Sequence, residues 1–214
     1  MKISILCTDE NHPINAHLQG WIGRNCDNHT ISLARKKNEL SGGDILFLVS
    51  CSEIVGAVDR AAYKASLVLH ASDLPVGRGW SPHIWQIVGG AEEVTLSLLE
   101  AEDKVDSGRI WWKTTFPVPK HALWDEINER LFNAEIDLID LAVDRFNTIT
   151  PKPQDAQTTP TYHPKRTPVA SKLDPRVSIA NQFDLIRVCD PIRFPAFFEL
   201  HGCKYKLTVE KIND

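Results

Sequence analysis

The sequence predicts an α/β protein with a Rossmann-like, mostly parallel sheet flanked by helices, followed by a small C-terminal helix and β-hairpin. Short apolar runs alternate with amphipathic stretches through residue 146, which is the pattern of strands and covering helices in such a sheet. Residues 147–168 then hold five prolines and six threonines among 22 residues, a composition that predicts no regular element and is typical of an extended linker or of a segment laid across the domain. We therefore expect a domain at 1–150, a linker at 151–170 and a small subdomain at 171–214.

The expected elements follow from periodicity. Compact apolar runs typical of buried strands lie at 2–7, 29–34, 44–51, 65–70, 93–101 and 109–118. Stretches with helical spacing of apolar residues lie at 14–24, 53–63, 81–90, 120–146 and 178–190. The chain then forms a hairpin over 196–212 with His201 and Gly202 at its turn. The helix at 120–146 fits packing on the sheet or on a partner subunit, which leaves a homodimer open.

Composition narrows the class of protein. The chain has 214 residues, with 43% hydrophobic and 24% charged residues, in the range of globular proteins. No apolar run approaches the ~20 residues of a membrane span, and the first residues turn polar too early for a signal-peptide core, so we expect a cytoplasmic protein without a membrane partner. The five cysteines are scattered without metal-ligand spacing, so no metal is expected. A net charge of −4 argues against a broad nucleic-acid surface.

The polar stretch "HASDLPVGRG" at 70–79 follows a buried strand directly. A lone histidine at a strand end is most often structural. Here Ser72, Asp73 and a Pro/Gly loop surround His70, and the loop leads into a helix, which suits it to hold an anionic or carbonyl group.

A second polar loop, "EAEDKVDSGRIW" at 100–111, carries four acids and follows another strand of the same sheet. It fits a solvated turn. Because loops at the carboxyl ends of parallel strands share one edge of a sheet, we expect this loop beside His70. A carboxylate beside an imidazole orients it and favours its charged form, an arrangement suited to proton transfer.

These motifs resemble the folate-dependent formyltransferases, which move a formyl group from N10-formyltetrahydrofolate to an amine. The resemblance rests on the His-x-Ser-x-Leu-Pro string from His70 to Pro75, the Arg78-Gly79 pair opening a helix, and the Asp-x-Gly loop from Asp106 to Gly108. It is specific over about residues 44–118 and extends to the linker "TYHPKRTPVASKLDP". It implies the formyltransferase fold and a formyltransferase catalytic domain at 1–150.

Within this family, "HASDLPVGRGWSPHIWQI" looks most like the sugar N-formyltransferases, which act on nucleotide-linked amino sugars of bacterial surface polysaccharides. The resemblance therefore implies N10-formyltetrahydrofolate as co-substrate, a nucleotide-linked amino sugar as acceptor, and no nucleic acid. Three alternatives stay open: formylation of methionyl-tRNA, formylation of glycinamide ribonucleotide, and a non-catalytic module that binds folate or a nucleotide. Neither the nucleotide, nor the sugar, nor the formylated amine follows from the sequence.

The resemblance also implies roles for single residues. His70 would stabilise the oxyanion or relay a proton, and Asp106 would hold His70 and help to move the proton. The folate would contact the chain around four positions: Leu48, Ser50, Glu102 and Val105. The acceptor would contact Asn11, Arg78, Trp80, Tyr162, Lys165 and Arg166, the last three lying in a basic and aromatic stretch that is also typical of a solvated linker.

One position departs from the family pattern. Val68 stands two residues before the histidine, where the family has an asparagine that helps to polarise the formyl carbonyl. Loss of one such donor costs about 2.7–4 kcal/mol of transition-state stabilisation. Another group such as Asn11 or Asn15 replaces it, or His70 and backbone amides suffice, or the protein binds without catalysing. We favour the first two, because the other site residues have no other evident purpose.

Overall fold

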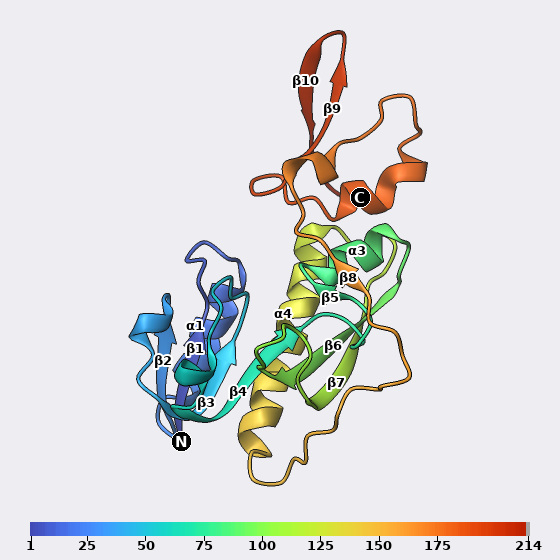
Figure 1. The fold of residues 1–214 in the computed structure, drawn as a ribbon. Coiled ribbons are helices and arrows are strands. Elements are labelled where there is room, and N and C mark those ends of the chain that lie inside the picture. The colour runs from blue at the N-terminus through green and yellow to red at the C-terminus, as the bar shows by residue number, and fades with distance from the viewer. Residues whose placement is uncertain (213–214) are drawn as a thin grey trace.

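The computed structural model describes residues 1–212, which build one six-stranded sheet with helices on it and a separate hairpin (Figure 1). The strand order is β2-β1-β3-β4-β6-β7. The sheet strands are β1 (Lys2–Leu6), β2 (Thr30–Ala34), β3 (Gly43–Leu48), β4 (Tyr63–His70), β6 (Glu93–Glu100) and β7 (Ile110–Pro117). Each coincides with an expected apolar run to within a few residues.

The sheet is parallel on one side and antiparallel on the other. β1 pairs in parallel with β2 and β3, and β3 pairs in parallel with β4. β6 runs antiparallel to β4, and β7 antiparallel to β6. The prediction of a mostly parallel sheet flanked by helices is confirmed. The reversal at β6 could not be predicted, because antiparallel strands buried on both faces have the same apolar pattern as parallel ones.

Helices form within the stretches where apolar periodicity predicts them, but those expected at 53–63 and 178–190 are much shorter than expected. They are α1 (Ile14–Asn25), α2 (Ala57–Arg60), α3 (Pro82–Val88), α4 (Trp124–Asp144) and α5 (Phe183–Arg187), with short 3₁₀ turns η1 (Lys37–Glu39), η2 (Pro168–Ser171) and η3 (Ala180–Gln182). α4 packs on β6 and β7 and against α1, which favours the sheet over a partner subunit as the cover of its apolar face. Its first turn is capped by Glu126, whose carboxylate accepts from the Leu123 amide at 2.9 Å.

The alternation of β4 determines which side chains face the site. Leu67 and Leu69 are buried in the main core with α1 and α4. Because side chains alternate along a strand, Ser66, Val68 and His70 point to the opposite face. The site is therefore built on the face of the sheet away from the large helices.

The segment 147–168, called the strap below, lies across the domain. It adds the two-residue strand β8 (Tyr162–His163), which pairs with β5 (Arg78–Gly79), and an isolated bridge between Lys152 and Ile110. The expectation that this segment has no regular element is therefore wrong at β8. Proline removes backbone donors only at its own positions, so the residues between prolines still pair.

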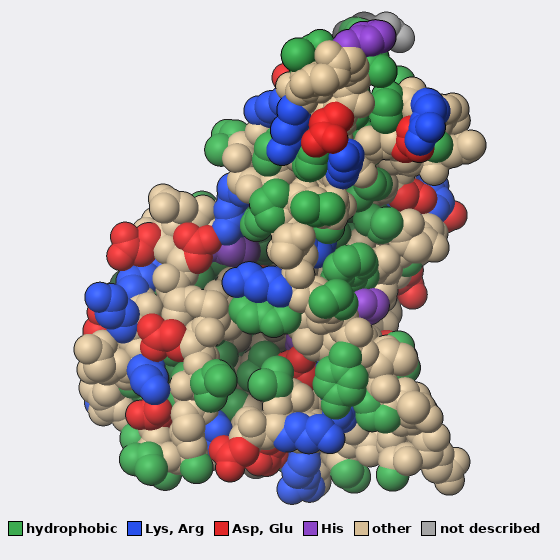
Figure 2. All heavy atoms as spheres, turned by 45° about the horizontal axis from the view of Figure 1, so that its top comes forward, with side chains coloured by type: hydrophobic (Ala, Val, Ile, Leu, Met, Phe, Trp, Pro, Cys, Tyr) green, Lys and Arg blue, Asp and Glu red, His purple; other side chains and the backbone are tan. Residues whose placement is uncertain are grey.

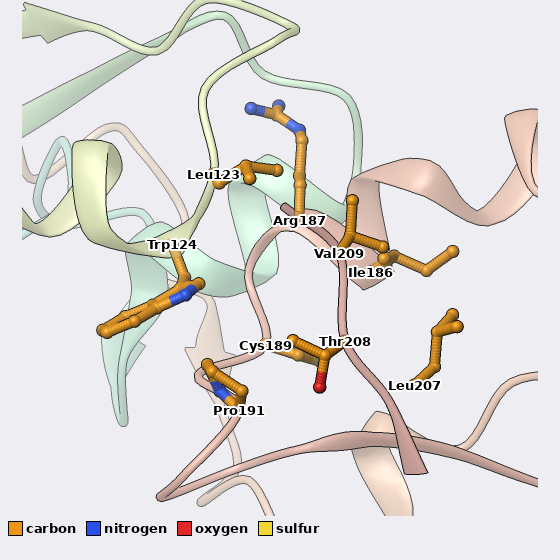
Figure 3. A pocket seen from close by; sticks show the side chains of 9 residues that line it. All are labelled: Leu123, Trp124, Ile186, Arg187, Cys189, Pro191, Leu207, Thr208 and Val209. Atoms are coloured by element: carbon orange, nitrogen blue, oxygen red, sulfur yellow. The ribbon is translucent and has the colours of Figure 1, made fainter. Parts of the chain in front are cut away.

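The C-terminal residues have their own small apolar cluster around Leu173, Ile186, Cys189 and Ala196. The hairpin of β9 (Ala196–Leu200) and β10 (Cys203–Leu207) turns at His201 and Gly202 as expected, both with positive φ, and projects away from the sheet (Figure 1). Arg187 connects this part to the main domain by donating to the carbonyl oxygens of Pro119 and Ala122 at 3.1 and 3.4 Å. The hollow beside it, shown in Figure 3, measures only about 10 Å³, room for about one water molecule.

Two properties bear on the class of protein. Within residues 1–212 no helix combines the length and apolar character that a membrane span requires. The same residues contain no group of three or more His, Cys, Asp or Glu side chains arranged to hold a metal ion.

Candidate active site

His70 and Asp106 lie together, as the sequence predicts. His70 Nδ1 is 3.5 Å from Asp106 Oδ1, and both side chains are more than nine-tenths buried. His70 Nε2 is 2.9 Å from the Gly77 carbonyl oxygen. Both ring nitrogens thus face oxygen acceptors, and only the doubly protonated ring donates to both of them.

The route by which Asp106 arrives differs from the prediction. Because β6 is antiparallel to β4, the loop after β6 leaves the sheet near Leu67, away from the end where His70 stands. The expectation that both loops emerge at one edge is therefore wrong. Residues 101–109 instead fold back toward His70, and Asp106 adopts a left-handed conformation with φ +54°.

The Asp106 carboxylate is shared between the two loops. Its second oxygen, Oδ2, accepts from the Gly79 amide at 2.8 Å while Oδ1 faces His70. The carboxylate therefore connects the imidazole to the first residues after the 70–77 loop. A group held on two sides in this way has a fixed orientation, which proton transfer requires.

Gln154 holds the backbone around Asp106, a role that no sequence motif predicted. Its side-chain nitrogen donates to the carbonyl oxygens of Asp106 and Gly108 at 2.9 and 3.0 Å. Its Oε1 accepts from Arg78 at 2.6 Å. An isolated glutamine between prolines has no motif, so only the three-dimensional contacts identify it.

The Arg78-Gly79 pair is held by β8, the two-residue strand within the strap. The Gly79 φ of +97° and its position against the strap require glycine, since a Cβ there would lie 2.3 Å from the His163 carbonyl oxygen. Buried Arg78 donates to Gln154 and, at 3.2 Å, to the Tyr162 hydroxyl. Arg78 therefore joins the two loops and the strap through its terminal nitrogens, while its buried Nε has no hydrogen-bond partner within residues 1–212.

The remaining residues expected at the acceptor lie near this strap but make different contacts. Trp80 and Tyr162 are exposed, and Lys165 Nζ stands 4.6 Å from the centre of the Trp80 ring. Arg166 donates to the Ala170 carbonyl oxygen at 3.1 Å. The stretch 162–166 therefore runs beside the site with one exposed cation and one exposed ring, and Trp80 adds a second exposed ring next to Lys165.

The residues expected at the folate come from two segments that meet at His70. Leu48 ends β3 in register with Val68 of β4, next to the His70 position on the same sheet face. Ser50 follows with φ +46°, which turns the chain after β3. Glu102 and Val105 are exposed on the loop that carries Asp106.

Val68 is half-buried between Leu48 and Leu99 in the sheet register, so an apolar strip stands where the family places a carboxamide. Asn15 does not replace that donor. Its side-chain nitrogen donates to the carbonyl oxygens of Asp9, Glu10 and His12, and its oxygen accepts from Arg35 at 2.7 Å. The proposal that Asn15 substitutes is therefore wrong, because its amide already holds the loop after β1. Asn11 is exposed on the same loop.

Histidines around the pair are kept neutral by their surroundings. Burial lowers the pKa of His83, on α3, to about 3, with the charge of His70 as the next cause. Burial, followed by the charge of Arg193, lowers the pKa of His12 to about 4. Burial followed by the charge of His70 also lowers the pKa of His163. The site thus contains several uncharged imidazoles around one that faces a carboxylate.

The fold and the site together resemble those of the formyltransferases, and comparisons with known proteins bear on this resemblance. No protein-family model matches the chain. A curated methionyl-tRNA formyltransferase from Ruegeria pomeroyi is 29% identical over 178 residues, which are 81% of this chain and 57% of that protein. The chain spans about half the length of the curated relatives it matches.

Solved structures show the same fold. A methionyl-tRNA formyltransferase from Clostridium thermocellum superposes with a TM-score of 0.85 at 21% identity, over 100% of this chain and 94% of that one. HypX from Aquifex aeolicus in complex with tetrahydrofolic acid superposes with a TM-score of 0.76 at 20% identity, over 95% of this chain and 36% of that one. A sugar N-formyltransferase from Shewanella superposes with a TM-score of 0.72 at 16% identity, over 100% of this chain and 99% of that one. The chain has the formyltransferase fold, and its resemblance to the folate-dependent formyltransferases is confirmed.

Proposed function

We propose that this protein is an enzyme that transfers a formyl group from N10-formyltetrahydrofolate to the amine of a nucleotide-linked amino sugar. The observation that carries the proposal is the buried His70–Asp106 pair, joined at 3.5 Å on one face of a sheet with the formyltransferase fold. On this proposal residues 1–150 form the catalytic domain, 151–170 the linker and 171–214 the small subdomain.

In the proposed reaction the neutral sugar amine attacks the formyl carbon, the bond from that carbon to N10 breaks, and one amine proton is delivered to the departing nitrogen. His70 would donate Nε2–H to the developing oxyanion, which would replace the Gly77 carbonyl oxygen as acceptor. Asp106, held by the Gly79 amide, would keep His70 oriented and relay the amine proton.

We place the co-substrate on the half-buried strip beside this pair. Leu48 and Val68 offer an apolar surface on the face that carries His70, and the buried Ser66 hydroxyl on that face has no hydrogen-bond partner within residues 1–212. Backbone groups around Ser50, Glu102 and Val105 would hold the ring system. The tetrahydrofolic acid in the HypX structure supports this assignment by analogy of fold.

The sugar nucleotide is favoured as acceptor by the net charge of −4 and by the sugar N-formyltransferase that matches over the full chain. Tyr162, Lys165 and Arg166 run beside the site and would contact it. The curated relatives favour a second candidate acceptor, methionyl-tRNA, and the Clostridium thermocellum methionyl-tRNA formyltransferase also matches over the full chain. The charge balance argues against it, since RNA binding rests on neutralising phosphates with Lys and Arg.

The test is an amine-formylation assay with N10-formyltetrahydrofolate and a panel of UDP-, dTDP-, GDP- and CMP-linked amino sugars, with methionyl-tRNA and glycinamide ribonucleotide in parallel. We expect a formylated sugar nucleotide in one reaction. Formylation of methionyl-tRNA or glycinamide ribonucleotide alone would overturn the acceptor. Folate binding without turnover on any acceptor would overturn catalysis and favour a binding module.

A further inference from the structure

The C-terminal segment contains a pocket of about 300 Å³ that none of the site residues lines. Its floor is apolar and its rim is basic. It is lined by Pro168, Arg193, Phe194, Pro195, Phe197, Lys204 and Lys206. Figure 2 shows Lys and Arg side chains gathered with hydrophobic ones over this end of the molecule.

The rim carries three cations and no carboxylate among its lining residues within the described chain. Lys204 and Lys206 alternate on β10 and so stand on one face of the hairpin. Lys204 Nζ lies 3.7 Å from the centre of the Phe197 ring. The nearest acid across the hairpin, Glu199, forms its ion pair with Lys172 at 2.6 Å instead.

Two chain segments connect the pocket to the His70 site. Arg193 lines the pocket and is ion-paired with Asp9 on the loop after β1, and its charge lowers the pKa of His12 on the same loop. On the other side, the strap passes from β8 beside Gly79 to Pro168 in the pocket wall. The pocket wall is therefore joined to the region around the site by an ion pair on one side and by a short chain segment on the other.

We propose that this pocket binds the nucleoside diphosphate portion of the acceptor, with the planar base against the apolar floor and the phosphates on the basic rim. The inference rests on the proposed function and deepens it by assigning the part of the substrate that does not react. A volume of about 300 Å³ is at the small end of ligand pockets and suits a nucleoside. Apolar stacking with flanking cations is the chemistry that recognises such a ligand.

The test measures binding of UDP, dTDP, GDP and CDP to the full chain by calorimetry, without folate. We expect one of them to bind, and Lys204→Gln/Lys206→Gln to weaken it at least tenfold. Phe194→Ala, which removes an exposed ring of the pocket, is expected to weaken it severalfold. Inorganic pyrophosphate is expected to bind at least tenfold more weakly than the nucleoside diphosphate.

Lys64→Gln/Lys211→Gln is the matched control, because it removes two lysines whose ion pairs, with Asp44 and Glu126, lie outside the pocket. It should bind like the wild type. The assignment is overturned if no nucleoside diphosphate binds, if the pocket variants bind normally, if the control weakens binding equally, or if pyrophosphate binds as tightly. If tRNA binds in a way that requires Lys204 and Lys206, and no nucleoside diphosphate binds, the pocket is assigned to RNA instead.

The two proposals fail separately. If nucleoside diphosphate binding requires the pocket lysines but no amine is formylated, the pocket assignment stands and the proposed formyl-transfer activity is refuted. Formylation of a sugar nucleotide with an unchanged KM in Lys204→Gln/Lys206→Gln would support the enzyme and refute the pocket.

Discussion

The two loops that bring His70 and Asp106 together are held in different ways. The loop 71–77 is fixed by its neighbours in the sheet and on α3: the Ser97 hydroxyl donates to the Ser72 carbonyl oxygen at 2.7 Å, and Gln86 donates to that of Ala71 at 3.1 Å. The first loop has one bond to the segment 147–168, from the Gly77 amide to the Thr161 hydroxyl at 2.8 Å. The loop 101–109 is held around Asp106 by a distant residue of that segment, Gln154. The first loop is thus held mainly by the sheet and α3, and the second mainly by the strap.

Removing either member of the pair is expected to have the largest effect. His70→Ala and Asp106→Asn should each lower kcat about 10³-fold, because each removes a group that moves or stabilises a proton in the transition state. The measurement is steady-state formylation with the acceptor found in the panel.

Asp103→Asn is the matched control, since Asp103 lies on the same loop but is exposed and pairs with Arg60. It should keep near wild-type kcat. Activity above a third of wild type in either pair variant would contradict the assigned roles.

The dependence of the second loop on the strap can be tested at Gln154. Gln154→Ala should lower kcat about 10- to 100-fold, because loss of two bonds to the 101–109 backbone lets Asp106 drift from His70. The KM for the folate should change much less. Kinetics and a thermal melt of each variant separate misplacement from unfolding.

Gln157→Ala serves as comparison, because Gln157 is an exposed glutamine of the same segment. Equal losses in both variants would show that the segment as a whole, and not the Gln154 contact, matters. A Gln154→Ala enzyme with normal kcat would remove the contrast between the two loops.

Val68 offers a gain of function. Val68→Asn places a carboxamide on the face that carries His70, two residues from it on β4, and should raise kcat about tenfold if an oxyanion donor is what the site lacks. Val68→Leu, with a similar volume and no donor, should not. A rate unchanged in Val68→Asn would indicate that His70 and backbone amides already suffice.

The same contrast explains what could be predicted from the sequence. The strands and helices of the sheet follow from apolar periodicity, and His70 follows from a motif that is continuous in the chain. The contact with Asp106 was expected for the wrong reason, since the antiparallel direction of β6 leaves no mark in a strand buried on both faces. Gln154 and the role of Asn15 depend on contacts between distant segments, which no local pattern encodes.

The smallest expected effect concerns the locally held half of the site, through His83 at the start of α3. Its pKa is about 3 in the folded protein, because burial disfavours the charged ring, and about 6.5 in the unfolded chain. Between these values the unfolded chain binds a proton that the folded protein does not. Stability is therefore full above about pH 6.5 and falls as the pH drops below it.

At pH 5.5 this single group should cost about 1 kcal/mol of unfolding free energy relative to pH 7.5. His83→Phe should reduce that pH dependence, measured by urea denaturation at both values, whereas exposed His121→Phe should leave it unchanged. The formyl-transfer rate distinguishes two causes. If His83→Phe keeps its activity and loses the pH dependence, the neutral ring only packs against the first loop. If His83→Phe retains the full pH dependence of unfolding free energy, the lowered pKa of His83 is not its cause.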